Sequence, residues 1–492
     1  MTHRLARLAI PAMLLTFLAA SAPDAIAQEP ALDALKKRAA AGDGEALLAL
    51  AQRQQTGIGA PVDLVAAAKG LQAAAAKGNL RAMARLGRMH LVGTAIDKSP
   101  IKALNCFRTA AEGGDAEAMS HLGMLYAKGG GTRRDPAEAL AWFRKSAEAG
   151  NPKGMLNLSM YLAGNRTRDP AARAAKQQEA GEWHDKARAK LQAAADSGDA
   201  EAMLTLGTIY LQAGTTDQDH LTRGAALYQK AAELGSTEAM RLFGLLHVGG
   251  TGVRQEPEKC LAWWRKAAER GDPEAMYALA DAHLDGNLAP RDQKAAAQWA
   301  QQAADAGHPR GMVIVAHAHQ HGAGLPKDDQ KSREWYSRAA QLGHGPALAQ
   351  LGLIYAEGRG IAKDETSAAM FFRSAANQGD SEGAFQLAQA YALGRGLPQS
   401  DAEAATWYKE AAAGNHAAAT FALGTISAAG RGVALDEKEA AFWYKIAAAA
   451  GHAPAMKSLA EAYRTGLGVK ADAALAAEWT AKADAAEKAP TK

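Results

Sequence analysis

The sequence predicts an all-α protein built as a solenoid, in which short helix pairs stack on one another along the chain. Two observations indicate this fold. One pattern of about 36 residues recurs along nearly the whole sequence, and every copy holds two helical patterns separated by glycines. A single pair of this size cannot bury both of its apolar faces, so each pair must pack against copies of itself.

The stretch 117–150 shows the pattern most clearly. Its first half places apolar or small residues at i, i+3, i+4 and i+7, the spacing of one face of a helix. These residues are Met119, Leu122, Gly123 and Tyr126. Gly129 and Gly131 follow and end this first helix.

A second helix is predicted directly after Asp135. Asp135 stands at the N-cap, Pro136 at N1 and Glu138 at N3, which is an acidic form of the capping box. Its buried side is expected to hold Leu140, Trp142, Phe143 and Ala147. Gly150 supplies the left-handed residue that ends the pair.

Twelve copies follow from the position of Met119. The equivalent residues are Leu47, Met83, Met119, Met155, Met203, Met240, Met276, Met312, Leu348, Ala384, Thr420 and Met456. The spacing is 36 residues except for 48 between Met155 and Met203 and 37 between Met203 and Met240. The fourth copy therefore carries an insertion of 12 residues, which we place within about 165–190 and expect to be helical.

The combined pattern resembles a known family. The run A-x-x-x-L-G-x-x-Y-x-x-G-x-G-V, followed by D-x-x-x-A-x-x-W-Y-x-x-A-A-x-x-G, is similar to the Sel1-like repeat, a relative of the tetratricopeptide repeat. The resemblance extends over residues 44–485. It implies a right-handed α-solenoid whose first helices line a concave groove that is used mainly to bind proteins, and it implies no single activity.

The ends of the chain predict a secreted protein. Residues 1–27 read as a signal peptide, because Arg4 and Arg7 precede an apolar stretch and the segment ends in the small residues Ala25 and Ala27. Residues 28–43 are expected to cap the solenoid, and residues 486–492 to be disordered. No later stretch is apolar enough to span a membrane. We therefore expect a protein that is soluble after cleavage, in the bacterial periplasm or secreted.

The charge balance argues against broad nucleic-acid binding, and the positions of the two cysteines argue against a disulfide. Without the signal-peptide residues Arg4, Arg7 and Asp24, the 56 basic and 52 acidic residues become 54 and 51, so broad nucleic-acid binding is not expected. Cys106 and Cys260 lie four copies apart. At about 10 Å per copy they would be too distant for a disulfide, and none is predicted.

The face of each first helix one residue beyond the core stripe is the candidate binding surface. Read along the chain it is strongly apolar, with Met124, Leu156, Met160, Leu204, Leu245, Tyr277, Val313, Leu353, Phe385 and Phe421. Exposed apolar rows mark interaction sites, so we expect a peptide or helix of another protein to bind there. Arg88, Arg241 and Asp281 would add polar specificity. The alternative is that this row is buried between neighbouring copies.

Three smaller features leave alternatives open. The insertion is mildly basic and contains Trp183, so it is either a solvated helix whose Trp fills the usual aromatic position or a docking spur for an acidic partner. His247, His283 and His319 replace the usual Tyr and are interpreted as ring-shaped fillers of a half-buried site. The histidines that follow a glycine, His308, His344 and His452, are interpreted as turn residues.

One set of residues could bind a metal. His317 and His321 share a helix face, and Asp281 and Asp285 hold the same two positions one copy earlier. Imidazole and carboxylate ligands suit zinc. The spacing matches no fixed metal motif, and an exposed charged pair explains these residues equally well, so neither a metal nor a cofactor is expected.

The sequence therefore favours a non-catalytic adaptor that binds another protein. A second possibility is a hydrolase acting on cell-wall or β-lactam material, since cysteine-rich relatives of this repeat have been assigned such activity. Those relatives carry paired cysteines in each repeat, and this chain has two in all. It also lacks the G-x-S-x-G and S-x-x-K motifs. A third possibility is a secreted factor that engages a host protein.

Overall fold

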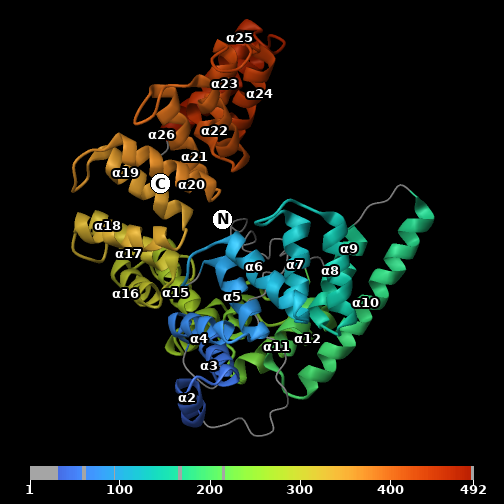
Figure 1. Cartoon of the computed structure of the whole chain (residues 1–492). Helices are drawn as coiled ribbons and strands as arrows, with labels where there is room; N and C mark the ends of the chain where they lie inside the picture. Colours follow the sequence, from blue (N-terminus) through green and yellow to red (C-terminus); the bar gives the residue numbers. More distant parts are fainter. Residues whose placement is uncertain (1–31, 58–61, 94, 165–168, 213–215, 489–492) are drawn as a thin grey trace. The chain divides into compact units, whose positions relative to one another are not determined.

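The computed structural model describes residues 32–57, 62–93, 95–164, 169–212 and 216–488. These residues form helices α2 to α26 and contain no strand (Figure 1). The all-α fold and the register of the helix pairs are thus as predicted. The predicted signal peptide, residues 1–27, lies outside the described residues. Helix α26 continues to Lys488, so the first residues of the predicted 486–492 tail are helical.

The chain divides into two compact units, which we call unit 1 and unit 2. Unit 1 comprises residues 1–318 and 323–326, and unit 2 comprises residues 319–322 and 327–492. The short α2 (Leu32–Ala40) comes first in unit 1. The helix pairs of unit 1 are α3 (Gly44–Thr56) with α4 (Leu64–Ala76), α5 (Leu80–Val92) with α6 (Pro100–Glu112), α7 (Ala116–Lys128) with α8 (Pro136–Glu148), α9 (Pro152–Gly164) with α10 (Pro170–Asp196), α11 (Ala200–Tyr210) with α12 (Gln218–Glu233), α13 (Thr237–Gly249) with α14 (Pro257–Glu269), and α15 (Pro273–Asp285) with α16 (Gln293–Asp305).

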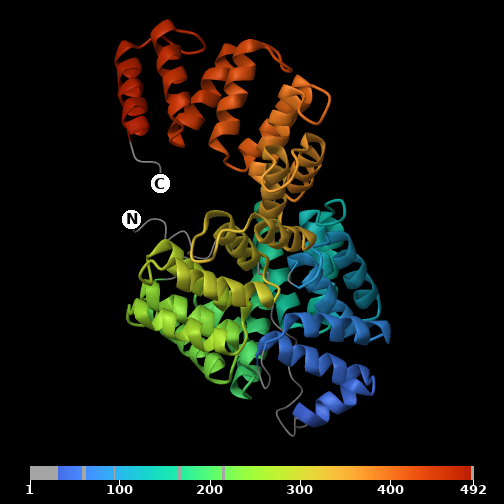
Figure 2. The ribbon, with the colours of Figure 1, turned by 90° about the vertical axis from the view of Figure 1, so that its left-hand side faces the viewer.

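Helix α17 (Pro309–His321) begins in unit 1 and ends in unit 2. Unit 2 continues with α18 (Asp329–Gln341), α19 (Gly345–Glu357) with α20 (Glu365–Asn377), α21 (Ser381–Leu393) with α22 (Asp401–Ala413), α23 (Ala417–Ala429) with α24 (Glu437–Ala449), and α25 (Ala453–Thr465) with α26 (Ala473–Lys488). Figure 2 shows these successive pairs of unit 2, coloured orange to red, packed side by side.

The helix ends form where the sequence predicts them. The Asp135 carboxylate accepts hydrogen bonds from the backbone N–H groups of Ala137 and Glu138 at 3.0 and 3.1 Å, which satisfies two donors that have no partner within the helix. Gly129 has φ 82° and its N–H donates to the Leu125 carbonyl, which ends α7. Glu256, at the start of α14, is an N-cap that makes no such side-chain bond.

A glycine in the first helix lets the two helices of a pair approach closely. A Cβ atom added to Gly123 would lie 2.7 Å from a ring carbon of Phe143, which is buried. Several second helices carry two successive aromatic residues, which we call the aromatic doublet. Its second ring is buried at Phe143, Trp264, Tyr336, Phe372 and Tyr408, and half-buried at Tyr444. The expectation that these rings are core is thus confirmed for the second ring of most doublets, while the first ring of each doublet is half-buried.

The insertion lengthens a helix. Helix α10 has 27 residues, whereas α8 has 13. Trp183 is half-buried and packs against the core of unit 1, and the ammonium of Lys186 lies 4.5 Å from its ring centre. Glu179 pairs with Arg144 of α8 at 3.0 Å. Trp183 thus serves as the aromatic residue of its pair, as the first of our two interpretations expects.

Unit 1 folds back on itself within six pairs. The Val62 N–H donates to the Arg270 carbonyl at 2.7 Å, and the Thr237 hydroxyl donates to the Thr56 carbonyl at 3.4 Å. These bonds join the first pair of unit 1 to the sixth. The first helices of the intervening pairs are thereby gathered around a common interior. Among the described helices, none is long and apolar enough to cross a membrane.

Candidate partner-binding face

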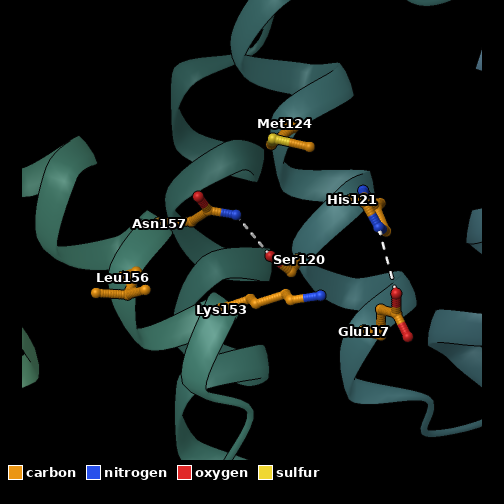
Figure 3. A pocket seen from close by; sticks show the side chains of 7 residues that line it. All are labelled: Glu117, Ser120, His121, Met124, Lys153, Leu156 and Asn157. Atoms are coloured by element: carbon orange, nitrogen blue, oxygen red, sulfur yellow. Dashed lines mark hydrogen bonds and ion pairs between the residues drawn. The ribbon is translucent and has the colours of Figure 1, made fainter. Parts of the chain in front are cut away.

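The first helices of neighbouring pairs lie next to each other and share one surface. Four residues of α7 (Glu117, Ser120, His121 and Met124) and three of α9 (Lys153, Leu156 and Asn157) line one small open hollow (Figure 3). First helices of neighbouring pairs contact each other at α5–α7, α7–α9 and α19–α21. We call this surface the inner face and define it by the positions of Glu117, Ser120, His121 and Met124 and their counterparts in the other first helices.

The ten apolar residues predicted to form a groove all lie on the inner face, with very different exposure. Leu156 and Leu204 are buried, with 5% and 2% of their surface exposed, so they belong to the core of unit 1. Met160 and Leu245 are 40% and 38% exposed. The remaining six are half-buried: Met124, Tyr277, Val313, Leu353, Phe385 and Phe421.

In unit 1 the inner face is dominated by charge. Arg88 pairs with Glu117 at 2.7 Å, with both side chains less than one-tenth exposed. The other ion pairs of this surface are Lys153–Glu201 at 2.5 Å, Arg241–Asp272 at 3.4 Å and Arg310–Glu274 at 2.8 Å. Arg85 is 2% exposed beside them. Each of these four pairs joins opposite charges from neighbouring helices, so these charges are neutralised within the protein.

Burial and ion pairing shift the pKa values of these carboxyl groups in opposite directions. Burial alone would raise the pKa of Glu117, but Arg88 and the other nearby cations outweigh it and hold the pKa well below its usual value. Burial raises the pKa of Glu201 to about 7, because Lys153 offsets the lost hydration only in part. Burial also lowers the pKa of Arg85 to about 10. Such a network is costly to disturb, because removing one charge leaves its partner buried.

The polar side chains around the hollow in Figure 3 contact one another. The Asn157 amide donates to the Ser120 hydroxyl at 2.8 Å, and His121 Nε2 lies 3.8 Å from a Glu117 oxygen. Burial lowers the pKa of His121, which favours its neutral form. The polar side chains that line the hollow are thus bonded to other groups of the protein. The charged side chains among them, Glu117 and Lys153, are already paired and are not available to a ligand.

In unit 2 the inner face is different. Across α19, α21 and α23 it consists of Pro346, Ala349, Gln350, Leu353, Glu382, Phe385, Gln386, Gln389, Ala418, Phe421, Ala422 and Thr425. Glu382 is the one charged residue of this set, and it is bonded to His416 at 3.1 Å. This bond lowers the pKa of Glu382. Across these three helices, unit 2 therefore presents a surface of aromatic, aliphatic and amide side chains with one charge. The equivalent positions of α25 hold the charged Lys457 and Glu461, which pair with Glu487 and Arg464.

Two aromatic rings of this surface are held in place by histidines. Phe385 stacks on His416 with 4.4 Å between ring centres, and Phe421 packs on His452 at 5.0 Å. Each histidine belongs to the next first helix along the chain and caps it. The half-buried rings are thus fixed between neighbouring pairs, which reduces the side-chain entropy that a binding partner would otherwise have to immobilise.

The Sel1 repeat family model matches residues 44–79, 80–115, 116–151, 200–236, 237–272, 273–308, 309–344, 345–380, 381–416, 417–452 and 453–483. These segments cover more than half of the chain. The chain belongs to the Sel1 repeat family. The matched segments leave out residues 152–199, where α9 and the long α10 form the fourth pair.

Solved structures of Sel1 repeat proteins resemble the chain. One is c5321, described as a protective antigen present in uropathogenic Escherichia coli strains, which is 26% identical and covers 94% of this chain and 98% of its own, with a TM-score of 0.49. Another is a Sel1 repeat protein from Oxalobacter formigenes, which is 29% identical over 61% of this chain and 86% of its own, with a TM-score of 0.46. No curated protein matched the chain. Sel1 and related repeats generally mediate protein–protein interaction and are generally non-catalytic.

The four residues considered as metal ligands do not form a site among the described residues. Within the described ranges, no three His, Cys, Asp or Glu side chains come close enough together to hold a metal ion. The set Asp281, Asp285, His317 and His321 is therefore not assembled. Burial and the neighbouring Asp285 raise the pKa of Asp281.

Other predicted positions have structural roles in the Sel1 repeats. His247 and His283 occupy the usual Tyr position and bond through Nδ1 to the carbonyls of Arg254 and Pro290 in the loops that follow. Cys106 and Cys260 are both free thiols. Burial raises the pKa of Cys260 to about 12, which makes it a poor nucleophile.

Sequence reasoning missed the charge network and the capping role of the histidines. Arg88 and Arg241 were expected to contact a partner, but both are engaged by acidic residues of the protein itself. The signal was present, because the second residue of most first helices in unit 1 is charged, as at Glu117, Lys153 and Glu201.

Proposed function

We propose that this protein is a non-catalytic interaction scaffold of the bacterial periplasm, and that the inner face of unit 2 binds an uncharged, apolar segment of another protein. The observation that supports this best is the contrast between the two units. The inner face of unit 1 is filled by ion pairs of its own, whereas the inner face of α19, α21 and α23 in unit 2 carries half-exposed Leu353, Phe385 and Phe421, with Glu382 as its one, paired charge.

The partner's chemistry follows from this surface. A charged segment would lose hydration against Phe385 and Phe421 without gaining an ion pair, because Glu382 already bonds His416. An apolar side chain loses nothing there, and aromatic anchors are typical of the residues that dominate binding energy. The amides of Gln350 and Gln389, on the same face, suit hydrogen bonds to the backbone of an extended segment.

In-cell photocrosslinking tests the proposal. A photoreactive residue is placed at Leu353, Phe385 or Phe421, and a control probe at Met370, an apolar residue of α20 that is 65% exposed and lies on a second helix. We expect adducts with one partner from the three inner-face positions and none from Met370. The adduct from Leu353 should disappear when Phe385 and Phe421 are both replaced by Ser.

Two results would contradict the proposal. Equal capture from Met370 would mean that apolar exposure alone explains the adducts. A partner segment rich in charged residues would contradict the chemistry that we assign to unit 2. Cell fractionation tests the location separately, since a periplasmic protein is released with the osmotic-shock fraction.

A further inference from the structure

Three first helices of unit 2 are capped by histidine: α19 by His344, α23 by His416 and α25 by His452. His416 Nδ1 accepts the N–H of Ala419 at 3.1 Å, and His452 Nδ1 accepts the N–H of Ala455 at 3.3 Å. Elsewhere most first helices use Asp, Asn or Ser, as Asn79 does for α5. An imidazole nitrogen accepts a hydrogen bond only when it carries no proton, so both caps require a neutral ring with its proton on Nε2.

His416 and His452 differ in one neighbour. Nε2 of His416 bonds the carboxylate of Glu382, and Asp380 lies near the same ring. One repeat later, the position of Glu382 is taken by Ala418. His452 therefore has no carboxylate at that place. The ring of Phe421 packs against His452, with 5.0 Å between the ring centres. The titratable group near His452 is His416.

Protonation affects the two caps unequally. A proton on Nδ1 turns the acceptor into a donor that faces the helix N–H groups, and it adds positive charge at the positive end of the helix dipole. Glu382 offsets the charge at His416, and nothing equivalent does so at His452. Burial, followed by the nearby His416, lowers the pKa of His452. The folded protein thus binds this proton less readily than the unfolded chain, so the cap's stabilisation is present above about pH 6.5 and is lost as the pH falls below it.

We propose that His452 is a pH-sensitive cap that loosens the junction between the last two repeats under mildly acidic conditions and so weakens the Phe421 end of the binding face. The effect on binding rests on the proposed function. The effect on the helix cap does not, and it is measured without a partner.

Hydrogen exchange of the full chain at pH 7.5 and pH 5.5, corrected for intrinsic exchange rates, tests the cap. Protection at the start of α25, around Ala455, should fall about fivefold at pH 5.5, the factor that matches loss of one N-cap. The H452N variant should keep its protection, because Asn caps a helix without titrating, as Asn79 does. The H416N variant, a matched control, should leave the change at α25 in place.

A gain-of-function variant sharpens the test. Ala418→Glu supplies the carboxylate that Glu382 provides one repeat earlier, so it should raise the pKa of His452, measured by NMR, and shrink the loss of protection at pH 5.5. Equal protection of wild-type α25 at both pH values, or the same fall in H452N, would overturn the proposal. If the cap responds but capture at Phe421 is equal at both pH values, the link to binding is wrong. If no partner is captured at any pH, the proposed function fails and the cap result stands.

Discussion

Arg88 and Glu117 form a buried ion pair between neighbouring first helices of unit 1, with 2.7 Å between Nη1 and Oε1. Their side chains are 6% and 9% exposed. This pair belongs to a network that includes Lys153 and Glu201, so the interior of unit 1 is held by charge as well as by apolar packing. The charged residues of this network are therefore engaged within unit 1 itself.

The Arg88→Met variant should lower the free energy of unfolding by about 3 kcal/mol, because Glu117 would remain buried without its principal cation. Urea denaturation followed by circular dichroism measures this loss. The double variant with Glu117→Met should recover most of it, since two apolar side chains replace the pair. If the double variant is as unstable as Arg88→Met, the cost is one of packing and not of charge.

The Gly123→Ala variant tests the close approach of α7 and α8. The added Cβ would lie 2.7 Å from the Phe143 ring, so we expect a loss of about 1 to 3 kcal/mol in unfolding free energy. Gly181→Ala is the matched control. Gly181 lies in α10 with open space around the added atom, so the better helix propensity of Ala should stabilise the protein by up to about 1 kcal/mol. Equal effects at both sites would contradict the contact.

The free energy of unfolding should depend on pH through the titration of Glu201. Its raised pKa, about 7, means that the folded protein holds a proton more readily than the unfolded chain. The stabilisation from this group is therefore complete below about pH 4.5 and is lost as the pH rises through 7, by about 3 kcal/mol in all. Glu117, whose pKa is lowered, acts in the opposite sense and only at more acidic pH.

Glu201→Gln isolates this contribution. The difference in unfolding free energy between the variant and the wild type should change by about 3 kcal/mol between pH 5 and pH 8, in favour of the variant at pH 8. Comparing the two proteins at each pH cancels the titration of His121, whose lowered pKa acts in the same window. A constant difference would show that Lys153 keeps Glu201 ionised throughout.

The fold was predictable because each part of it has a local cause. Asp135 and Gly129 set the ends of their helices, and the spacing around Met119 sets the buried face, so a few residues in sequence decide each pair. The inner face was not predictable in this way. Leu156 and Phe385 lie at equivalent positions on the same face of their helices. Leu156 is buried and Phe385 is half-buried, and this difference depends on how the neighbouring pairs pack, which the sequence of one pair does not encode.

The helix caps provide a last pair of predictions. The carboxylate of Asp135 reaches two backbone N–H groups of α8, whereas the longer side chain of Glu256 makes no bond to the start of α14 and pairs with Lys259 instead. Glu256→Asp should therefore stabilise the protein by about 0.5 to 1 kcal/mol, and Asp135→Glu should destabilise it by a similar amount. Thermal or urea unfolding measures both. Both substitutions exchange Asp and Glu at equivalent positions, so neither variant changes the net charge. Changes of the same sign in both variants would mean that local contacts such as Lys259, and not the cap, decide stability at these sites.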